Sequence, residues 1–220
     1  MEKIVKNEDR RDFLKVSGSA AGGLALAFYL PTARQAQAAD GGSPNAWVKI
    51  AADNTVTIMN ARSEMGQDVY TSMPMLVAEE LEVDINAIKV EFAPPAEVYI
   101  NSLLGGQITG GSTAVRDAWE KLRKAGASAR MMLVAAAADN WGVDPSKCSV
   151  SNGMISGPGG KKATYGSVAA KAATMEVPKE VPLKPASQFK IVGSTKQKRL
   201  DTGMKVRGTA GFGIDTIVPG

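Results

Sequence analysis

One apolar pattern limits the possible folds of this chain more than any other feature. Apolar residues recur at helical spacing from Val115 to Ala136, and this predicts one long helix from about residue 113 to 140. The first half of the helix has a polar face, whereas the second half, MMLVAAAA at 131–138, has none. Because a helix that is apolar all round is buried in a larger body, other elements must pack around this one.

Alternating patterns before the long helix predict short strands. The stretch WVKIAADNTVTIM alternates apolar and polar residues on both sides of Asp53-Asn54, which indicates strands at about 47–51 and 55–60. The Asp-Asn pair is compatible with a type I′ turn between them. A third strand is expected at 87–93, where a Pro-Pro pair follows and stops it.

A second helix is expected between these strands. Val69, Met73, Val77 and Leu81 fall at helical spacing. Pro74 lies inside this pattern, so the helix either begins near Ser72 or is kinked there.

Turn residues divide the part of the chain that follows the long helix. Gly142 is a C-terminal stop for that helix, and Asn152-Gly153 predicts a hairpin turn between two short strands. Residues 165–175 are a plausible short helix. The sum of these elements is a mixed α+β fold with β-hairpins and one long buried helix.

The C-terminal part has a different composition. Prolines and lysines alternate at 178–185, which is typical of a linker. From Phe189 onward the chain has strand-like pieces without a visible pairing partner, so it resembles the opening of a second domain. The basic stretch at 196–207, KQKRLDTGMKVR, favours a solvated surface strand or linker.

Composition excludes several classes of site. The chain has 44% hydrophobic residues, enough for a core, but no histidine, which excludes Ser-His-Asp hydrolysis and His-ligated zinc. Cys148 is the single cysteine and cannot supply an iron–sulfur cluster by itself. Residues 39–220 contain 20 basic and 18 acidic residues, too balanced to indicate a nucleic-acid partner. Any redox centre is therefore bound from outside or lies on a partner.

The N-terminus has the pattern of an export signal. RRDFLK at 10–15 precedes an apolar run from Val16 to Leu30 and a small-x-small site at 36–38. The run is shorter than the roughly 20 residues that cross a bilayer. Residues 1–38 are therefore expected to be a cleaved twin-arginine signal peptide that sends the protein to the periplasm, with membrane association if cleavage does not occur.

Two glycine-containing loops precede helices and are the candidate binding site. GGQITGGST at 105–113 has the glycines and the helix start that suit a phosphate, but it lacks the lysine of a P-loop and the GxGxxG spacing. The alternative is a plain loop in which Ser112 or Thr113 caps the helix. SEMGQD at 63–68 is the other loop. Gln67 and Gln107 could offer amides to one polyanionic cofactor, or be ordinary loop amides.

The ordered motifs resemble a known family. RRDFLK, PNAWVKI, SEMGQDVYTSMPMLVAEEL, GGQITGGSTAVRDAWEKLRKAGASAR, NWGVDPSKC and GSTKQKRLDTGMKV together resemble the N-terminal part of the large subunit in the isoquinoline 1-oxidoreductase branch of the xanthine oxidase family of molybdenum hydroxylases. Aldehyde and nicotinate dehydrogenases are near this branch. The resemblance covers essentially the whole chain.

The resemblance implies a cofactor, a reaction and partners. The cofactor is molybdopterin cytosine dinucleotide, and the reaction hydroxylates an N-heterocycle or oxidises an aldehyde with oxygen from water. Electrons pass to a small subunit with two [2Fe–2S] clusters and often onward to a c-type cytochrome. Asp68 stands where relatives often have glycine. The positions that match cofactor-lining stretches are Gly66, Gln67, Gly105, Gly106, Gln107, Thr109, Gly110, Gly111, Ser112 and Thr113.

The same resemblance implies an organisation in parts. Residues 1–38 are the signal, 45–180 part of the molybdopterin-binding domain, and 181–220 a linker with the incomplete start of a hammerhead domain. The family's catalytic glutamate lies in a later part of the large subunit, so no catalytic residue or metal ligand is assigned here. Glu64, Glu79 and Glu80 are not expected to replace it, and Glu79 and Glu80 are expected to be solvated on their helix.

Two other hypotheses remain open at the level of sequence. The chain could be an exported module that binds a nucleotide or polyanion without catalysis. It could also be a non-functional truncated product, in which the apolar 131–138 segment would lack its cover.

Overall fold

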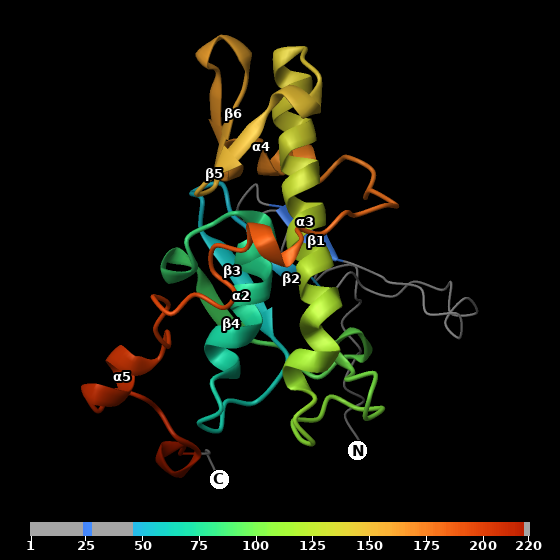
Figure 1. Cartoon of the computed structure of the whole chain (residues 1–220). Helices are drawn as coiled ribbons and strands as arrows, with labels where there is room; N and C mark the ends of the chain where they lie inside the picture. Colours follow the sequence, from blue (N-terminus) through green and yellow to red (C-terminus); the bar gives the residue numbers. More distant parts are fainter. Residues whose placement is uncertain (1–23, 28–45, 218–220) are drawn as a thin grey trace, which may run out of the picture.

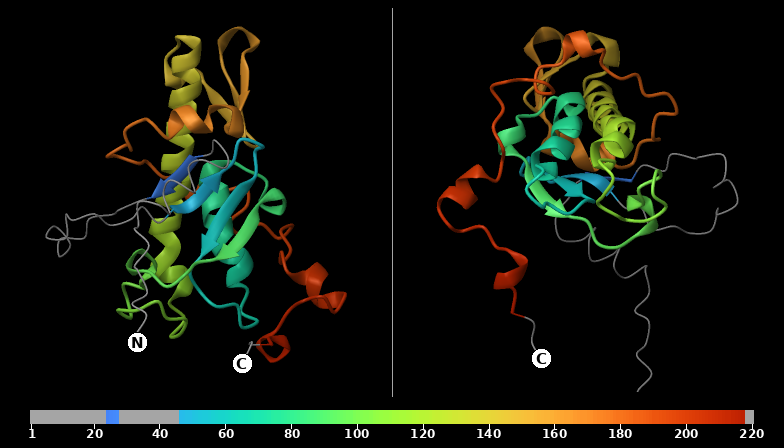
Figure 2. Two further views of the ribbon diagram at one scale, coloured as in Figure 1. Left: turned by 180° about the vertical axis from the view of Figure 1, so that it is seen from behind. Right: turned by 60° about the horizontal axis from the view of Figure 1, so that its bottom comes forward.

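A computed structural model describes residues 24–27 and 46–217 and has a mixed α+β fold, as the sequence predicts. A four-stranded sheet is covered on one face by two adjacent helices, α2 (Val69–Leu81) and α3 (Ala114–Trp141). A small three-stranded sheet lies near the C-terminal end of α3 (Figure 1). The right-hand view in Figure 2 shows both helices on the same side of the larger sheet.

The larger sheet has strand order β1-β2-β3-β4, formed by Leu24–Ala27, Ala46–Ile50, Val56–Asn60 and Lys89–Phe92. The first three strands are antiparallel, whereas β3 and β4 are parallel because α2 crosses over between them. The strands predicted at 47–51, 55–60 and 87–93 are confirmed. β1 was not predicted, and the rest of the predicted signal segment lies outside the described residues.

The turn between β2 and β3 differs from the predicted type I′ turn. A type I′ turn needs positive φ at both central residues, but of the pair only Asn54 has it, at 71°. The Asn54 amide donates to the Ala51 carbonyl at 3.0 Å, and the Ala51 amide donates to the Thr55 carbonyl at 2.9 Å. The Asn54 side chain accepts a hydrogen bond from the Gly166 amide at 2.9 Å, which holds this residue in its left-handed conformation.

Helix α2 begins at Val69, so of the two alternatives a start near Ser72 is wrong, and the helix instead continues through Pro74. The earlier start is possible because the Glu64 carboxylate accepts a hydrogen bond from the Tyr70 amide at 3.0 Å, which satisfies a donor of the first turn. Pro74 lies inside the helix, in its second turn.

Helix α3 spans 28 residues and ends at Gly142, which has φ 65°, so the predicted helix and its stop are confirmed. It packs closely on α2. A Cβ added at Gly126 would lie 2.5 Å from the Val77 carbonyl oxygen. The predicted all-round burial of 131–138 is wrong on one side, because Met131, Val134 and Ala135 remain partly exposed.

The small sheet consists of β5 (Ser149–Ser151), β6 (Met154–Ser156) and β7 (Lys162–Thr164), all antiparallel. Asn152 and Gly153 have φ of 47° and 70°, so the predicted hairpin is confirmed, with the φ signs of a type I′ turn. The short helix α4 (Tyr165–Ala172) follows, as predicted for 165–175.

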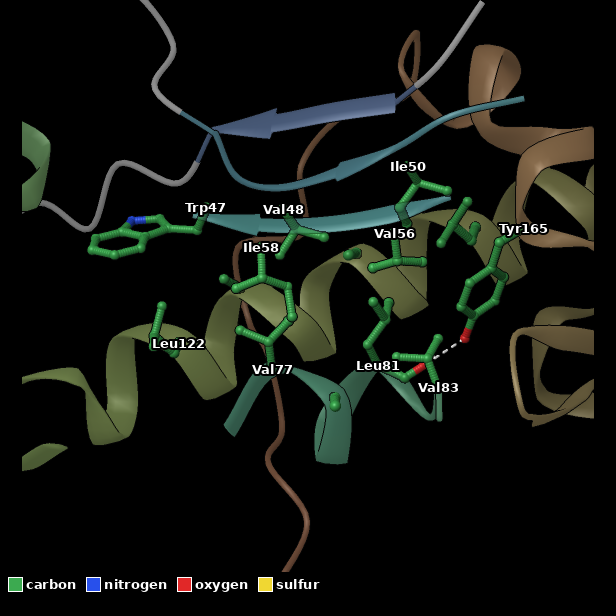
Figure 3. Packing of buried hydrophobic residues seen from close by; sticks show 14 of the residues in the cluster. Trp47, Val48, Ile50, Val56, Ile58, Val77, Leu81, Val83, Leu122 and Tyr165 are labelled. Atoms are coloured by element: carbon green, nitrogen blue, oxygen red, sulfur yellow. Dashed lines mark hydrogen bonds between the residues drawn. The ribbon is translucent and has the colours of Figure 1, made fainter. Parts of the chain in front are cut away.

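Tyr165 connects the small sheet to the main core. Its hydroxyl donates to the Leu81 carbonyl at 2.6 Å, and burial raises its pKa (Figure 3). The core itself lies between the large sheet and the helices. Figure 3 shows Val48, Ile58 and Val77 converging there.

The structure differs from two expectations, one about the segment after 180 and one about two glutamates of α2. The described part of the tail, 189–217, contains no strand, and the basic stretch includes the short helix α5 (Thr202–Val206). Glu79 and Glu80 are 1% and 0% exposed rather than solvated. The Glu79 carboxylate accepts the amides of residues 190, 191 and 192, and Glu80 forms an ion pair with Arg123 at 2.6 Å. The tail therefore supplies the donors that make the burial of Glu79 possible, and α3 supplies the partner of Glu80.

Short 3₁₀ helices complete the fold: η1 (Ile85–Ala87), η2 (Glu97–Tyr99), η3 (Pro145–Lys147), η4 (Pro158–Gly160), η5 (Ala186–Gln188) and η6 (Gly213–Asp215). Among residues 24–27 and 46–217, no helix is both long enough and apolar enough to cross a membrane.

Candidate cofactor-binding loops

The first candidate loop, residues 63–68, is organised by the carboxylate of Glu64. This carboxylate accepts hydrogen bonds from the amides of Gly66 at 2.8 Å, Asp68 at 3.1 Å and Tyr70 at 3.0 Å. Burial opposes ionisation of Glu64, but these amides and Arg199 outweigh it, so the pKa lies below its usual value. These three amides are already used by an internal anion and are not free for a ligand in this conformation.

Gln67 is held within its own loop. Its side-chain nitrogen donates to the Ser63 carbonyl at 2.8 Å, and its oxygen accepts the Met65 amide at 2.6 Å. Gly66 has φ 101°, and a Cβ built on it would meet no atom within 4 Å. The outer face of this loop is therefore open, although the glutamine amide is engaged.

Asn101 holds the start and the end of the second candidate loop, residues 101–113, together. Its carbonyl accepts the Gly105 amide at 2.8 Å, and its side chain donates to the Thr113 hydroxyl at 2.7 Å. That hydroxyl in turn donates to the Gly110 carbonyl at 2.8 Å. Thr113 is the N-cap of α3, as one hypothesis predicted, but its side chain closes the loop and makes no capping hydrogen bond to the helix.

The distal half of the second loop has open backbone donors. Among the described residues, the amides of Thr109, Gly110, Gly111 and Ser112 donate to no protein acceptor. Gly111 and Ser112 have positive φ, 58° and 53°. Successive amides in such a turn form a concavity that binds anions, and the start of α3 directly follows.

Gln107 points to a different neighbour. Its side-chain oxygen accepts the Ala96 amide at 3.1 Å, and its nitrogen donates to the Ala93 and Pro94 carbonyls at 3.4 Å. Both predicted glutamine amides are thus engaged with nearby backbone. Gly105 and Gly110 are open, since an added Cβ would meet nothing within 4 Å, whereas at Gly106 it would meet the Ile108 side chain at 2.9 Å.

The structure brings the two loops together. The Ser63 amide of the first loop donates to the Thr109 hydroxyl of the second at 2.9 Å. Beneath them, the guanidinium of Arg62 pairs with the carboxylate of Asp117 at 2.9 Å, both side chains being buried. Burial lowers the pKa of Arg62, and Asp117 opposes that shift. The predicted convergence of the loops therefore has a structural basis.

Several residues of this region were not found by sequence reasoning. Arg62, Glu64, Asn101 and Asp117 build the loops, yet none was predicted to do so. The available signal was position: Arg62 and Glu64 lie beside and inside the motif at 63–68, and Asn101 and Asp117 each lie four residues from the motif at 105–113.

Arg116 was also missed. It lies in the first turn of α3, is exposed, and has no ion-pair partner within the described part of the chain. Because it is exposed and has no such partner there, Arg116 is available to a bound anion. A bound anion would also offset the unfavourable interaction of this cation with the helix dipole.

One cavity lies away from these loops. A cavity of about 350 Å³ is lined by the C-terminal end of α2 and by the tail, including Glu82, Asp84, Lys184 and Lys196. None of the candidate loop residues lines it. We favour the loops as the site because open amides, not cavity size, match the predicted anionic group.

No cluster of three or more metal-ligating side chains occurs within 24–27 and 46–217.

Comparisons with known proteins identify relatives. The chain is 36% identical over 182 residues to the membrane-bound aldehyde dehydrogenase [pyrroloquinoline-quinone] of Gluconacetobacter polyoxogenes, a match that covers 80% of this chain and 23% of that protein. It is 30% identical over 254 residues to the isoquinoline 1-oxidoreductase subunit beta of Brevundimonas diminuta, with 96% and 32% covered. The chain thus spans a third or less of the length of these relatives.

A solved structure is also similar. Quinoline 2-oxidoreductase from Pseudomonas putida 86 matches with a TM-score of 0.42 and 16% identity, over 58% of this chain and 16% of that one. The family model of the molybdopterin cofactor-binding domain matches residues 5–214. The chain therefore belongs to the family of molybdopterin cofactor-binding domains.

Proposed function

We propose that this chain is the N-terminal portion of the large subunit of a molybdenum hydroxylase and supplies loops that hold the molybdopterin cofactor. The observation that carries the proposal is the row of open amides at 109–112, placed between the first loop and the start of α3. Membership of the cofactor-binding family supports the same assignment.

The second loop fits the pyrophosphate of the dinucleotide form of the cofactor, molybdopterin cytosine dinucleotide. A pyrophosphate needs several donors in a small space, and the amides of Thr109 to Ser112 with Arg116 provide them. Gly105, Gly106, Gln107 and Thr113 shape the same loop. The first loop contributes the open face of Gly66 and Gln67 rather than its amides, which Glu64 occupies.

The chemistry comes from the cofactor. When bound, the molybdenum centre supplies a two-electron oxidation of the substrate with oxygen from water. The residues of this chain bind and orient the cofactor and take no part in proton transfer. Glu64, Glu79 and Glu80 are each engaged by backbone amides or by an arginine, so none is available as a base. The base is expected in a later part of the subunit.

The names of the relatives suggest the substrates and partners. They point to an N-heterocycle or an aldehyde as the substrate class. One relative is named as a subunit, which supports a multi-subunit enzyme. We propose, from the family resemblance alone, that its electrons pass to a small [2Fe–2S] subunit and then to a c-type cytochrome. The RRDFLK motif supports export to the periplasm by the twin-arginine pathway.

The test is a chemical analysis of the protein expressed together with its downstream reading frame. Purified protein should contain about one molybdenum atom per chain and release a cytidine nucleotide after mild acid hydrolysis. A folded full-length product without molybdenum would sink the proposal. A bound quinone in place of the pterin would show that this chain shares the cofactor printed in the name of its aldehyde dehydrogenase relative.

The second candidate is an exported module that binds a nucleotide or polyanion without catalysis. The same open amides would serve it. Tight binding of cytidine diphosphate by the chain alone, together with a full-length product that oxidises no aldehyde or N-heterocycle, would favour this alternative.

A further inference from the structure

We propose that the buried ion pair between Arg62 and Asp117 is the positioning element that fixes the spacing of the two candidate loops. This inference rests on the proposed function for its meaning. Arg62 directly precedes the loop at 63–68, and Asp117 lies in the first turn of α3, just after the loop at 101–113. The side chains are 1% and 3% exposed and 2.9 Å apart.

The guanidinium of Arg62 connects three segments. One nitrogen, Nη2, donates to Asp117 Oδ2, and the other, Nη1, donates to the carbonyls of Ala61 and Tyr99 at 2.8 Å. Ala61 follows the last residue of β3, and Tyr99 precedes the second loop by two residues. The end of β3 is thus tied both to the start of the second loop and to the helix that follows it.

The carboxylate of Asp117 closes the second loop on its own helix. Its Oδ1 accepts the Ser102 amide at 2.8 Å and the Lys121 ammonium at 2.7 Å. Lys121 also donates to the Ser102 hydroxyl at 2.7 Å and the Ile100 carbonyl at 3.3 Å. The carboxylate of Asp117 therefore connects the start of the second loop, at Ser102, with the helix that follows the end of the loop.

These contacts make the pair a positioning element and not a ligand-binding one. Asp117 pairs with both Arg62 and Lys121, and the side chains of Arg62 and Asp117 are buried, so neither of these two side chains reaches a bound cofactor. A cradle that is already fixed needs little ordering when its ligand binds. Removing Asp117 leaves the buried Arg62 guanidinium without its carboxylate, and removing Arg62 leaves the Ala61 and Tyr99 carbonyls without their donor, so either change should release both loops together.

The test compares hydrogen exchange of both loops in full-length protein prepared without molybdate. Asp117→Asn, Arg62→Met and the double variant are expected to speed exchange of peptides covering 63–68 and 101–113 by about tenfold or more. The double variant should add little to either single one, since both remove the same pair. Exchange of β2 and β3 amides should change much less, which separates loop release from general destabilisation.

A matched control is a second ion pair made by an arginine of α3. Arg130 pairs at 3.0 Å with Glu82, the residue that follows α2, and both lie far from the loops in sequence. Arg130→Met should leave exchange of both loops unchanged. If Arg62→Met does not fold, Asp117→Asn decides the question, because it keeps the size of the side chain and removes its charge.

The outcomes separate this inference from the proposed function. Unchanged loop exchange in Asp117→Asn, or a change in only one loop, overturns the inference even if the protein binds the cofactor. Joint release of both loops supports it. If joint release is seen but the wild-type protein grown with molybdate binds no pterin, the positioning role stands and the proposed function fails.

Discussion

Glu64 illustrates how one side chain can set the conformation of a whole loop. Its carboxylate accepts three backbone amides and faces Arg199 at 3.2 Å. The sequence places Glu64 two residues before Gly66 and assigns it no function. The structure instead makes it an internal anion, which a linear pattern does not reveal because two of its partners, Tyr70 and Arg199, lie outside the loop.

The titration of Glu64 gives a pH prediction. Its folded pKa lies below the ordinary value of 4.5, so its contribution to stability is present above pH 4.5 and is lost as the pH falls through the folded value. Glu64→Gln should lower the free energy of unfolding at pH 7 by roughly 1–3 kcal/mol. Thermal unfolding from pH 7 to pH 3 should show this difference shrinking below pH 4.5. A difference that grows with acidification would contradict the assignment.

Arg116 carries a prediction about anion binding. Arg116→Gln should weaken cofactor binding by the full-length protein about tenfold, because a charge-assisted contact to phosphate is lost. The fraction of molybdenum retained after dialysis measures this loss. Its melting temperature should not fall, since a cation is unfavourable in the first turn of a helix. Lys162→Gln, an exposed lysine on β7, is the control and should retain the metal fully. Equal retention in both variants would remove Arg116 from the site.

At the level of elements, the helices and strands of the described region were largely predictable from sequence. Periodicity located α2, α3 and the strands of the large sheet, and Gly142 and Asn152-Gly153 marked a stop and a turn. The failures have a common cause. The conformation of the β2–β3 turn and the burial of Glu79 each depend on backbone amides from a distant segment, namely Gly166 and residues 190–192.

The contact of α2 with α3 gives the element-scale prediction. Gly126→Ala should destabilise the protein by about 1–3 kcal/mol, because the new Cβ would lie 2.5 Å from the Val77 carbonyl oxygen and the helices must separate. Chemical denaturation measures this loss. Gly211→Ala, at a glycine with open space around it, is the control and should have little effect. An unchanged midpoint in Gly126→Ala would show that the helices do not pack this closely.

At the level of the whole molecule, the tail packs back onto the body through buried charges. Lys184 contacts Glu79 and Glu82, and Glu79 accepts the amides of residues 190–192. Nearer the loops, Arg199 contacts Glu64 and Asp68 and holds the pKa of Asp201 at about 2. The tail thus reaches the first candidate loop, a contact that its lysine-rich and proline-rich sequence did not predict.

Loss of the Glu79 contacts should free the tail. Burial opposes ionisation of Glu79, but the amides of Ile191, Val192 and Lys190 and the charge of Lys184 lower its pKa overall, so it is a charged acceptor at pH 7. Glu79→Gln should therefore speed tryptic cleavage after Lys190 and Lys196 several-fold. Glu120→Gln, which alters an exposed pair with Lys124, is the control. Equal cleavage rates would mean that other contacts hold the tail.

Of the candidate site, the sequence indicated the two loops and their nearness, while the function of each group within them required the structure. The open amides at 109–112 are a property of backbone conformation, which residue types alone do not determine. These amides concern only the pyrophosphate of the cofactor.

The most direct test is an experimental structure of the full-length protein with its cofactor bound. We predict that the pyrophosphate oxygens lie within hydrogen-bonding distance of the amides of Thr109, Gly110, Gly111 and Ser112, with the first loop beside the pterin. A structure in which a cofactor is bound elsewhere, with these four amides facing solvent, would contradict the central claim.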